Sequence, residues 1–233
     1  MGDAPGPAER LMKILNSQTA EGIIFPVDAR LRPEGQSGPL VHSVAAYRRY
    51  FETRAQPWEG QALTKARPLF GPQGEAFLDL AKEAWALVGQ RDDLLPQVRA
   101  MHERVVKARS AEDKLDYKTG RGGLMEAEFL AQGLQMKHGV WENHTLNGLR
   151  ALGASGILPE DEVARVTGSY RFLRRAEAVL RRAENTGVSS LPADPEAQRK
   201  LAHRLGYPDA EAFFADYNGC RAAIHAVFDR HIR

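Results

Sequence analysis

Three charged residues alternate with small or apolar ones in the segment Val27-Asp-Ala-Arg-Leu-Arg32. Successive side chains of a β-strand point to opposite faces, so Asp28, Arg30 and Arg32 would share one face of a strand. A carboxylate is a ligand for a hard cation such as Mg²⁺, and a guanidinium group binds two phosphate oxygens at once. The pattern therefore indicates a phosphate-and-metal site. A solvated strand face with internal ion pairs would produce the same pattern.

A second polar group lies beside a tryptophan in the segment Trp58-Glu-Gly-Gln-Ala-Leu63. Glu59 and Gln61 could position a substrate or hold the arginines of the first segment. In the alternative interpretation, Trp58 and Leu63 belong to the core and the polar residues between them lie on the surface.

Glycines and basic residues precede a predicted helix in the segment Asp116-Tyr-Lys-Thr-Gly-Arg-Gly-Gly123. The free N–H groups at the start of a helix bind anions, so this turn is a candidate anion site. It is not a Walker A phosphate loop, because no Gly-Lys-Ser/Thr follows at the required spacing.

Glu128 and Gln132 lie among apolar residues of the following helix, and Glu177 lies in the apolar seam of a later one. Buried polar side chains are nearly always hydrogen-bonded, so these three residues predict a structural polar network between helices. The arginines that flank Glu177 are expected to form a solvated face. The seven histidines are scattered, which does not fit the spacing of a metal site. Cys220, on an apolar helix face, is expected to be a packed thiol.

The segment that carries Asp28 is predicted to be a strand over residues 22–32, because its odd positions from 23 to 31 are all apolar. Pro26 donates no hydrogen bond, which indicates a sheet edge or a bulge. Residues 40–42 are a second, shorter strand candidate. A two-stranded ribbon is marginally stable by itself, so we expect strand 22–32 to belong to a larger sheet whose other strands are not supplied by this segment.

The rest of the chain shows helical periodicity, and eight of the 13 prolines precede residue 73. Ser43, Asp92, Asp194 and Asp209 occupy expected N-cap positions. Helices are predicted over residues 8–16, 44–54, 74–89, 93–109, 123–138, 144–153, 160–185, 195–205 and 210–231. The predicted fold is mainly α, with a helical bundle over residues 73–233 preceded by a partial α+β domain over residues 1–72.

The composition is that of an ordinary globular protein, with 43% hydrophobic and 27% charged residues among 233. It excludes a fully disordered chain, a collagen-like fibre and a disulfide scaffold. The single cysteine forms no internal disulfide, so we expect a reducing, cytoplasmic location. No apolar stretch approaches the roughly 20 residues that span a bilayer, and the formal net charge of +2 is evenly spread. We therefore expect neither a membrane nor nucleic acid as a partner.

Taken in order, these segments resemble the glutamine synthetase adenylyltransferase family. The resemblance extends over nearly the whole chain. It rests on Gly22–Pro33, Gly35–Gly38, Trp58–Arg67, Lys118–Leu124 with Glu128 and Gln132, and Tyr170–Arg175 with Glu177.

The resemblance implies a nucleotidyltransferase domain followed by a helical bundle shared with PII uridylyltransferases. Such an enzyme transfers AMP from ATP to a tyrosine of glutamine synthetase, or removes it by phosphorolysis, and the PII signalling protein sets the balance. The reaction is an in-line displacement at phosphorus assisted by two Mg²⁺ or Mn²⁺ ions. Asp28 matches the third metal-binding aspartate of the family, which implies that it is a metal ligand and a catalytic residue. Arg30, Arg32, Glu59 and Gln61 are implied as residues that bind substrate or nucleotide.

The sequence departs from the family pattern at the metal site, because no Gly-Ser turn followed by Asp-x-Asp precedes Asp28. One carboxylate does not hold two divalent ions against water. We therefore expect this chain alone to be inactive or weakly active. It would be the C-terminal part of one unit, without the preceding part of the enzyme. Gly60 stands where histidine is usual, and Glu126 where aspartate is usual. The alternative is a non-catalytic helical module that docks onto glutamine synthetase or the PII protein. Whether the unit is adenylylating or deadenylylating stays open.

Overall fold

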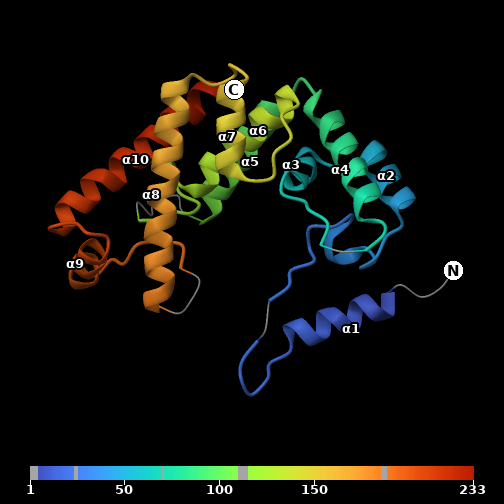
Figure 1. Cartoon of the computed structure of the whole chain (residues 1–233), viewed down its shortest axis with the longest axis horizontal. Coiled ribbons are helices and arrows are strands. Elements are labelled where there is room, and N and C mark those ends of the chain that lie inside the picture. The colour runs from blue at the N-terminus through green and yellow to red at the C-terminus, as the bar shows by residue number, and fades with distance from the viewer. Residues whose placement is uncertain (1–4, 24–25, 70, 110–114, 185–187) are drawn as a thin grey trace. The chain divides into compact units, whose positions relative to one another are not determined.

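The computed structural model describes residues 5–23, 26–69, 71–109, 115–184 and 188–233, and every regular element in these ranges is helical (Figure 1). The mainly α architecture expected from the sequence is thereby confirmed. The chain divides into two compact units, Met1–Trp85 and Ala86–Arg233. The division lies within helix α4 (Gly74–Gly89), whereas the proline distribution places it before residue 73.

The first unit contains α1 (Pro5–Asn16), α2 (Val44–Thr53), α3 (Pro57–Leu63) and most of α4. Ser43 caps α2 as predicted, because its side chain accepts a hydrogen bond from the backbone N–H of Ala46, 3.2 Å away. With seven residues, α3 is too short for helical periodicity to reveal it. Pro57 begins this helix, and Gln56 and Glu59 close a reciprocal capping box around its first turn.

Aromatic side chains join α2 to α4. The rings of Tyr47 and Phe77 meet edge to face with centroids 5.2 Å apart, and Tyr47 also stacks on Phe51 at 6.2 Å. Further along α4, the buried indole N–H of Trp85 donates to the hydroxyl of Thr64, 2.9 Å away. Because Thr64 directly follows α3, this bond fixes α3 against α4.

The two predicted strands are wrong within the described residues. Residues 26–32 and 40–42 have no strand geometry, and the nearest bridge in the described chain is an isolated one between Thr19 and Gly22. Residues 24 and 25, near the start of the predicted strand, lie outside the described residues. A strand needs a neighbour to receive its backbone hydrogen bonds. No other part of the described chain forms a ladder of backbone hydrogen bonds with residues 26–32.

The expected alternation of exposure is present over residues 26–30 but reverses at Leu31 and Arg32. Leu31, expected to face a core, is 73% exposed, whereas the side chain of Arg32 is partly buried. Side chains bond the backbone groups that a sheet would pair: the amide of Asn16 accepts from the N–H of Val27 at 2.7 Å and donates to its carbonyl at 3.2 Å. The segment is therefore an irregular connection held by side chains.

The described residues of the second unit form the end of α4 and six further helices, each within one residue of its predicted bounds: α5 (Leu94–Arg109), α6 (Leu124–His138), α7 (Thr145–Ala154), α8 (Glu160–Glu184), α9 (Pro195–Arg204) and α10 (Ala210–His231). Asp194 and Asp209 are N-caps as predicted, since each carboxylate accepts a backbone N–H at 2.8 Å. The prediction for Asp92 is wrong, because α5 begins at Leu94 and Asp92 lies one residue too early.

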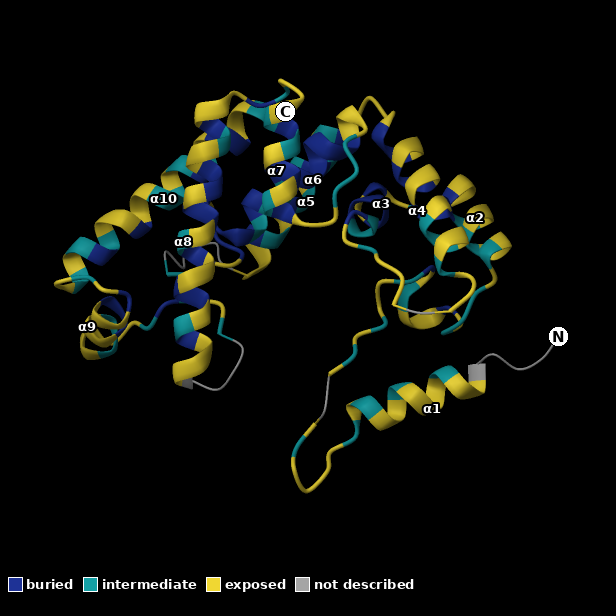
Figure 2. Cartoon of the chain, in the orientation of Figure 1, coloured by how far each residue is buried: buried dark blue, intermediate teal, exposed yellow. Residues whose placement is uncertain are grey.

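Helix α6 lies at the centre of this bundle. It packs against α5, α7, α8 and α10, and α10 also runs along α8 (Figure 1). Figure 2 shows α6 buried along most of its length, and ten of its 15 residues are buried. A helix that is buried on all sides must find partners for its polar side chains inside the protein.

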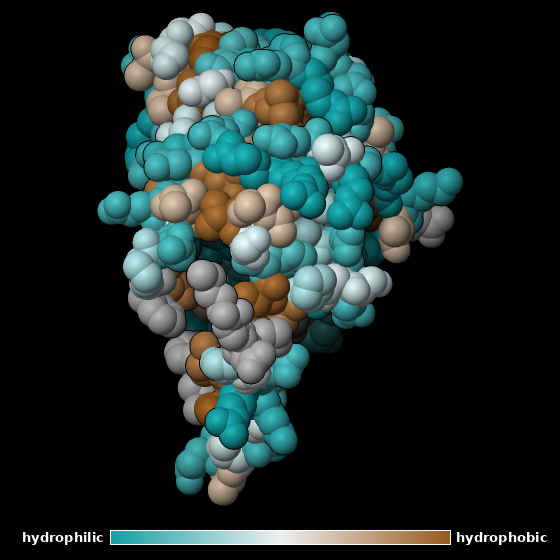
Figure 3. Space-filling model, turned by 90° about the vertical axis from the view of Figure 1, so that its right-hand side faces the viewer, coloured by the Kyte–Doolittle hydropathy of each residue, from teal (hydrophilic) through white to brown (hydrophobic). Residues whose placement is uncertain are grey.

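Exposed apolar side chains are concentrated in the first unit. Of the seven large hydrophobic side chains that are exposed among the described residues, Leu87 alone belongs to the second unit. No described side chain of α1 is buried (Figure 2). In the face shown in Figure 3, brown apolar patches interrupt a mostly hydrophilic surface. None of the described helices combines the length and the hydropathy that crossing a membrane requires.

Candidate functional site

Asp28 and Arg30 form a close pair on the surface of the first unit. One carboxylate oxygen of Asp28 accepts from the backbone N–H of Arg30 at 2.9 Å, and both oxygens accept from its guanidinium at 2.6 to 2.9 Å. These bonds from Arg30 lower the pKa of Asp28 to about 2. Asp28 is therefore ionised at neutral pH. Both side chains are more than half exposed, so they can exchange this pairing for a ligand.

Arg32 does not share the face of Asp28 and Arg30. Its guanidinium donates to three backbone carbonyls of its own loop, including those of Gly38 and Pro39 at 3.1 Å. Arginine is suited to this role because its donors spread in a fixed plane. Arg32 thus closes the loop that follows Asp28, and the structure brings together only two of the three charged groups that the spacing indicates.

The Asp28 carboxylate does not form a metal centre by itself. Mg²⁺ and Mn²⁺ require several oxygen ligands, and no group of three or more His, Cys, Asp or Glu side chains in the described part of the chain could hold a metal ion. Both oxygens of Asp28 are also bonded to Arg30. The described residues therefore do not fit a two-metal site, although Asp28 could supply one ligand to a larger one.

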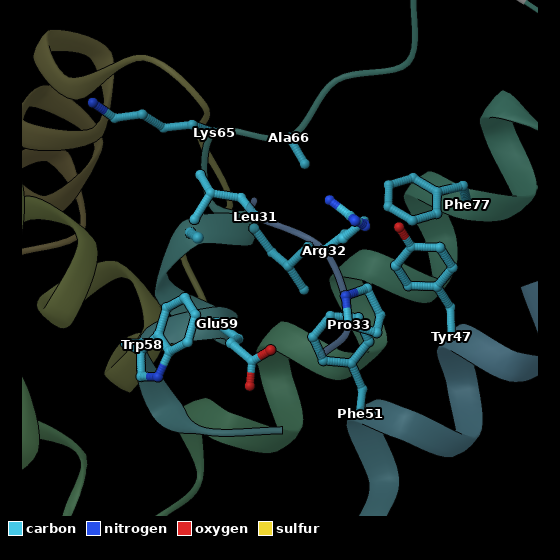
Figure 4. Close-up of a pocket in the computed structure, with 12 residues that line it drawn as sticks. Leu31, Arg32, Pro33, Tyr47, Phe51, Trp58, Glu59, Lys65, Ala66 and Phe77 are labelled. Atoms are coloured by element: carbon cyan, nitrogen blue, oxygen red, sulfur yellow. The ribbon is translucent and has the colours of Figure 1, made fainter. Parts of the chain in front are cut away.

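A pocket of about 270 Å³ opens beside this loop in the first unit (Figure 4). Aromatic and aliphatic side chains form most of its wall, as in sites for small molecules, and Trp58 at its edge stays 40% exposed. Arg32, Glu59 and Lys65 contribute its charged groups. Burial raises the pKa of Tyr47, so its phenol remains neutral. Such a pocket suits a planar, mostly apolar group with a polar edge.

Helix α3 determines where Glu59 and Gln61 lie. The carboxylate of Glu59 accepts from the hydroxyl of Tyr50 and from the backbone N–H of Gln56, each at 2.7 Å, so it caps α3 and joins it to α2. Glu59 also lines the pocket. Gln61 is buried and does not line it.

Asp28 and Arg30 lie outside the pocket and line a more open groove, of about 500 Å³, on the same loop. Arg32 contributes to the walls of both hollows. The structure therefore divides the site residues between an exposed ion pair and an apolar pocket, with the loop closed by Arg32 between them.

In the second unit, Glu128 and Glu177 belong to one hydrogen-bonded network between α6 and α8. Arg174 joins them, because it donates to Glu128 at 3.0 Å and to Glu177 at 2.7 Å. The hydroxyl of Tyr170 donates to Glu128 at 2.8 Å and accepts from Arg174 at 3.0 Å. Burial and the neighbouring Glu128 raise the pKa of Tyr170 to about 12. Gln132, one turn beyond Glu128, is buried. These contacts hold helices together.

The glycine-rich turn 118–123 is satisfied by the chain itself. The first N–H groups of α6 donate to the backbone carbonyls of Tyr117 and Lys118, each at 2.9 Å. The N–H of Gly122 donates to the carboxylate of Glu126. Gly122 has a φ of +70° and packs against the backbone of Arg221 in α10. The anion that the sequence indicates at this helix start is therefore a side chain of the protein.

Two buried glutamates of the second unit bind histidines of α10. Nδ1 of His225 lies 2.7 Å from Glu126, and Nε2 of His231 lies 2.6 Å from Glu162. The partners are 99 and 69 residues apart, so spacing does not reveal them. The available signal is that each glutamate lies in the first turn of a helix, but acidic residues are common there because of the helix dipole.

Comparison with known proteins identifies two families in order along the chain. Residues 7–80 match the family model of glutamate-ammonia ligase adenylyltransferase, and residues 94–232 match that of GlnD PII-uridylyltransferase. The chain is 36% identical over 208 residues to a bifunctional glutamine synthetase adenylyltransferase/adenylyl-removing enzyme of Streptomyces avermitilis. It is also 36% identical to the enzymes of the same name from Cutibacterium acnes and Streptomyces coelicolor. The alignments cover 85 to 88% of this chain but 21 to 22% of the relatives, so the chain spans about a fifth of their length.

Proposed function

Because the chain belongs to the glutamine synthetase adenylyltransferase family, we propose that it is part of an enzyme that transfers AMP from ATP to a tyrosine of glutamine synthetase, or removes it by phosphorolysis. One observation carries this proposal: bifunctional glutamine synthetase adenylyltransferase/adenylyl-removing enzymes are 36% identical to at least 85% of the chain. We assign residues 1–72 to the trailing part of a nucleotidyltransferase domain and residues 73–233 to the helical bundle. The cytoplasm is the expected location, and the PII protein the expected regulatory partner.

Within the first unit, Asp28 would supply one carboxylate to the reaction site, and Arg30 would bind phosphate oxygens after leaving Asp28. Their mutual exposure supports this exchange. The pocket beside Trp58 would take the nucleobase, because bases stack on aromatic side chains with about 1–3 kcal/mol per base. Arg32 and Glu59 would act by shaping the pocket, and Gln61 by supporting α3 from its buried position.

Mg²⁺ or Mn²⁺ would accompany ATP in the complete enzyme, with Asp28 as one ligand among several. The other carboxylates would come from an Asp-x-Asp pair in the preceding part of the enzyme. We therefore propose that the isolated chain has little or no transfer activity.

The proposal is tested with a chimaera in which this chain replaces the aligned fifth of the Streptomyces coelicolor relative. Transfer of labelled AMP to glutamine synthetase and its phosphorolytic removal are both measured. We expect activity in one direction. Asp28 would also help to deprotonate the attacking hydroxyl, so Asp28→Asn should reduce this activity by at least about 100-fold, the lower end for a group that transfers a proton in the reaction. Asp79→Asn is the matched control, because Asp79 is an exposed acid on α4 away from the pair. Full activity of the Asp28→Asn chimaera would show that Asp28 has no such role.

Calorimetry on the isolated chain distinguishes the enzyme fragment from a non-catalytic docking module. Binding of ATP with Mn²⁺ that weakens on Asp28→Ala supports a residual active site. Binding of glutamine synthetase or PII protein without any affinity for ATP supports the module. Robust AMP transfer by the isolated chain would contradict the proposed incompleteness.

A further inference from the structure

Two histidines approach one buried carboxylate at the start of α6. One oxygen of Glu126 lies 2.7 Å from Nδ1 of His225 in α10. The other accepts the N–H of Gly122 and lies 3.8 Å from Nε2 of His102 in α5. That last distance is too long for a hydrogen bond, and Nε2 of His102 has no hydrogen-bond partner although the side chain is 1% exposed. A buried polar atom without a partner calls for an explanation.

The two imidazoles differ in their affinity for a proton. Burial lowers the pKa of His102, and Glu126 only partly opposes this effect. The hydrogen bond to Glu126 raises the pKa of His225. As the pH falls, His225 therefore takes its proton first and His102 takes a second one later.

The surrounding charges come from the glycine-rich turn, α5 and α10. Arg121, in the glycine-rich turn, disfavours protonation of both histidines. Glu103 on α5 favours it at His102, and Asp229 on α10 favours it at His225. A proton on His225 disfavours a second one on His102, and the rings of Phe129 and Phe228 lie beside His102 with 6.1 and 4.8 Å between centroids. Glu126 is therefore the nearest acceptor for a proton that arrives on His102.

We propose that Glu126 is a proton-operated latch, which holds Gly122 and the glycine-rich turn at neutral pH and releases Gly122 when His102 becomes protonated. A charge-assisted bond from His102 requires the carboxylate oxygen to move by about 1 Å, from 3.8 Å to ordinary bonding distance. Gly122 cannot follow, because it already touches α10: a Cβ built on it would lie 2.1 Å from the carbonyl oxygen of Arg221. A shift of this oxygen toward His102 therefore lengthens and weakens its bond to Gly122.

Release of Gly122 weakens the contact between the turn and α10. That contact is otherwise carried by Arg221, whose guanidinium donates to the carbonyl of Arg121 at 2.9 Å. The turn leads directly into α6, the central helix of the bundle. The latch therefore connects the protonation of His102 on α5 to the position of α10 on α6.

Hydrogen exchange at the Gly122 amide tests the latch in the full chain between about pH 7.5 and pH 4, a window extended downward because the pKa of His102 lies below the ordinary value of histidine. After correction for the intrinsic rate, we expect protection to fall about tenfold, the change expected for the loss of one hydrogen bond from the amide. His102→Leu should abolish this pH dependence. His203→Gln is the control, because His203 is an exposed histidine on α9, and it should behave as the wild type does.

A second measurement keeps the test decisive where His102→Leu does not fold. In wild-type protein with labelled histidine, the imidazole of His102 and the amide of Gly122 should titrate with one common midpoint by NMR. Constant protection of Gly122, a midpoint that belongs to His225 instead, or a pH dependence that survives in His102→Leu would each overturn the proposal.

Discussion

Replacement of Gly122 by alanine should detach the glycine-rich turn from α10. Gly122 has a φ of +70°, and this left-handed conformation costs a residue with a Cβ about 1–2 kcal/mol. The new Cβ would also lie 2.1 Å from the carbonyl oxygen and 2.6 Å from the carbonyl carbon of Arg221. Both atoms belong to the backbone of a helix and cannot move aside alone. Overpacking adds about 1–3 kcal/mol, which makes the expected loss of unfolding free energy about 2–5 kcal/mol.

Gly139→Ala separates the two contributions. Gly139 ends α6 with almost the same φ, +71°, but a Cβ built on it meets no atom within 4 Å. Its replacement should therefore cost only the conformational part, about 1–2 kcal/mol. The difference between the two variants, about 1–3 kcal/mol, measures the contact with Arg221.

Urea unfolding followed by far-ultraviolet circular dichroism gives both free energies, and hydrogen exchange of α6 and α10 locates the loss. In Gly122→Ala, exchange should accelerate in the turn and in the part of α10 around Arg221, whereas Gly139→Ala should affect the end of α6. Equal unfolding free energies for the two variants would refute the close approach of the turn to α10.

Three further changes test contacts elsewhere in the chain. Trp85→Phe leaves the buried hydroxyl of Thr64 without its donor and should lower the unfolding free energy by about 1–3 kcal/mol. A double-mutant cycle with Thr64→Val checks this, and a coupling energy of zero would exclude the bond. Tyr170→Phe removes the hydroxyl that donates to Glu128 and should cost about 1 kcal/mol in urea unfolding, so an unchanged midpoint speaks against the network. His225 has a raised folded pKa, so its stabilisation is complete below its ordinary value and is lost as the pH rises through the folded value. The stability difference between wild type and His225→Gln should therefore shrink from about pH 6 to pH 9, and a constant difference would contradict the ion pair.

The helices of the second unit could be predicted from the sequence because their signals are local. Asp194 and Asp209 each precede a helical run, and each caps a helix in the structure. The strand over residues 22–32 could not be excluded in the same way. Its alternation is present in the sequence, but a strand depends on a neighbour, and the side chains of Asn16 and Arg32 bond the backbone of Val27 and Ala29 instead.

The same distinction between local and tertiary signals applies to the candidate site. The pairing of Asp28 with Arg30 follows from a separation of two residues and needs no tertiary information. The role of Arg32 depends on carbonyl groups of residues 38 and 39, whose positions are set by a loop that periodicity does not describe. The bond between Glu126 and His225 spans 99 residues, and no pattern within either helix indicates it.

The glycine-rich turn shows that residues which mark a family need not carry its chemistry. Gly122 is required there by its backbone conformation and by its approach to Arg221, and Glu126 fills the place of an anion at the start of α6. Substitutions in this turn should therefore alter the stability of the bundle before they alter ligand binding. Around Asp28 the opposite holds, since its partner Arg30 is exposed and little is packed on either side chain. A substitution there should leave folding nearly unchanged and affect only what the site binds, which separates the proposed chemistry of the first unit from the scaffold role of the second.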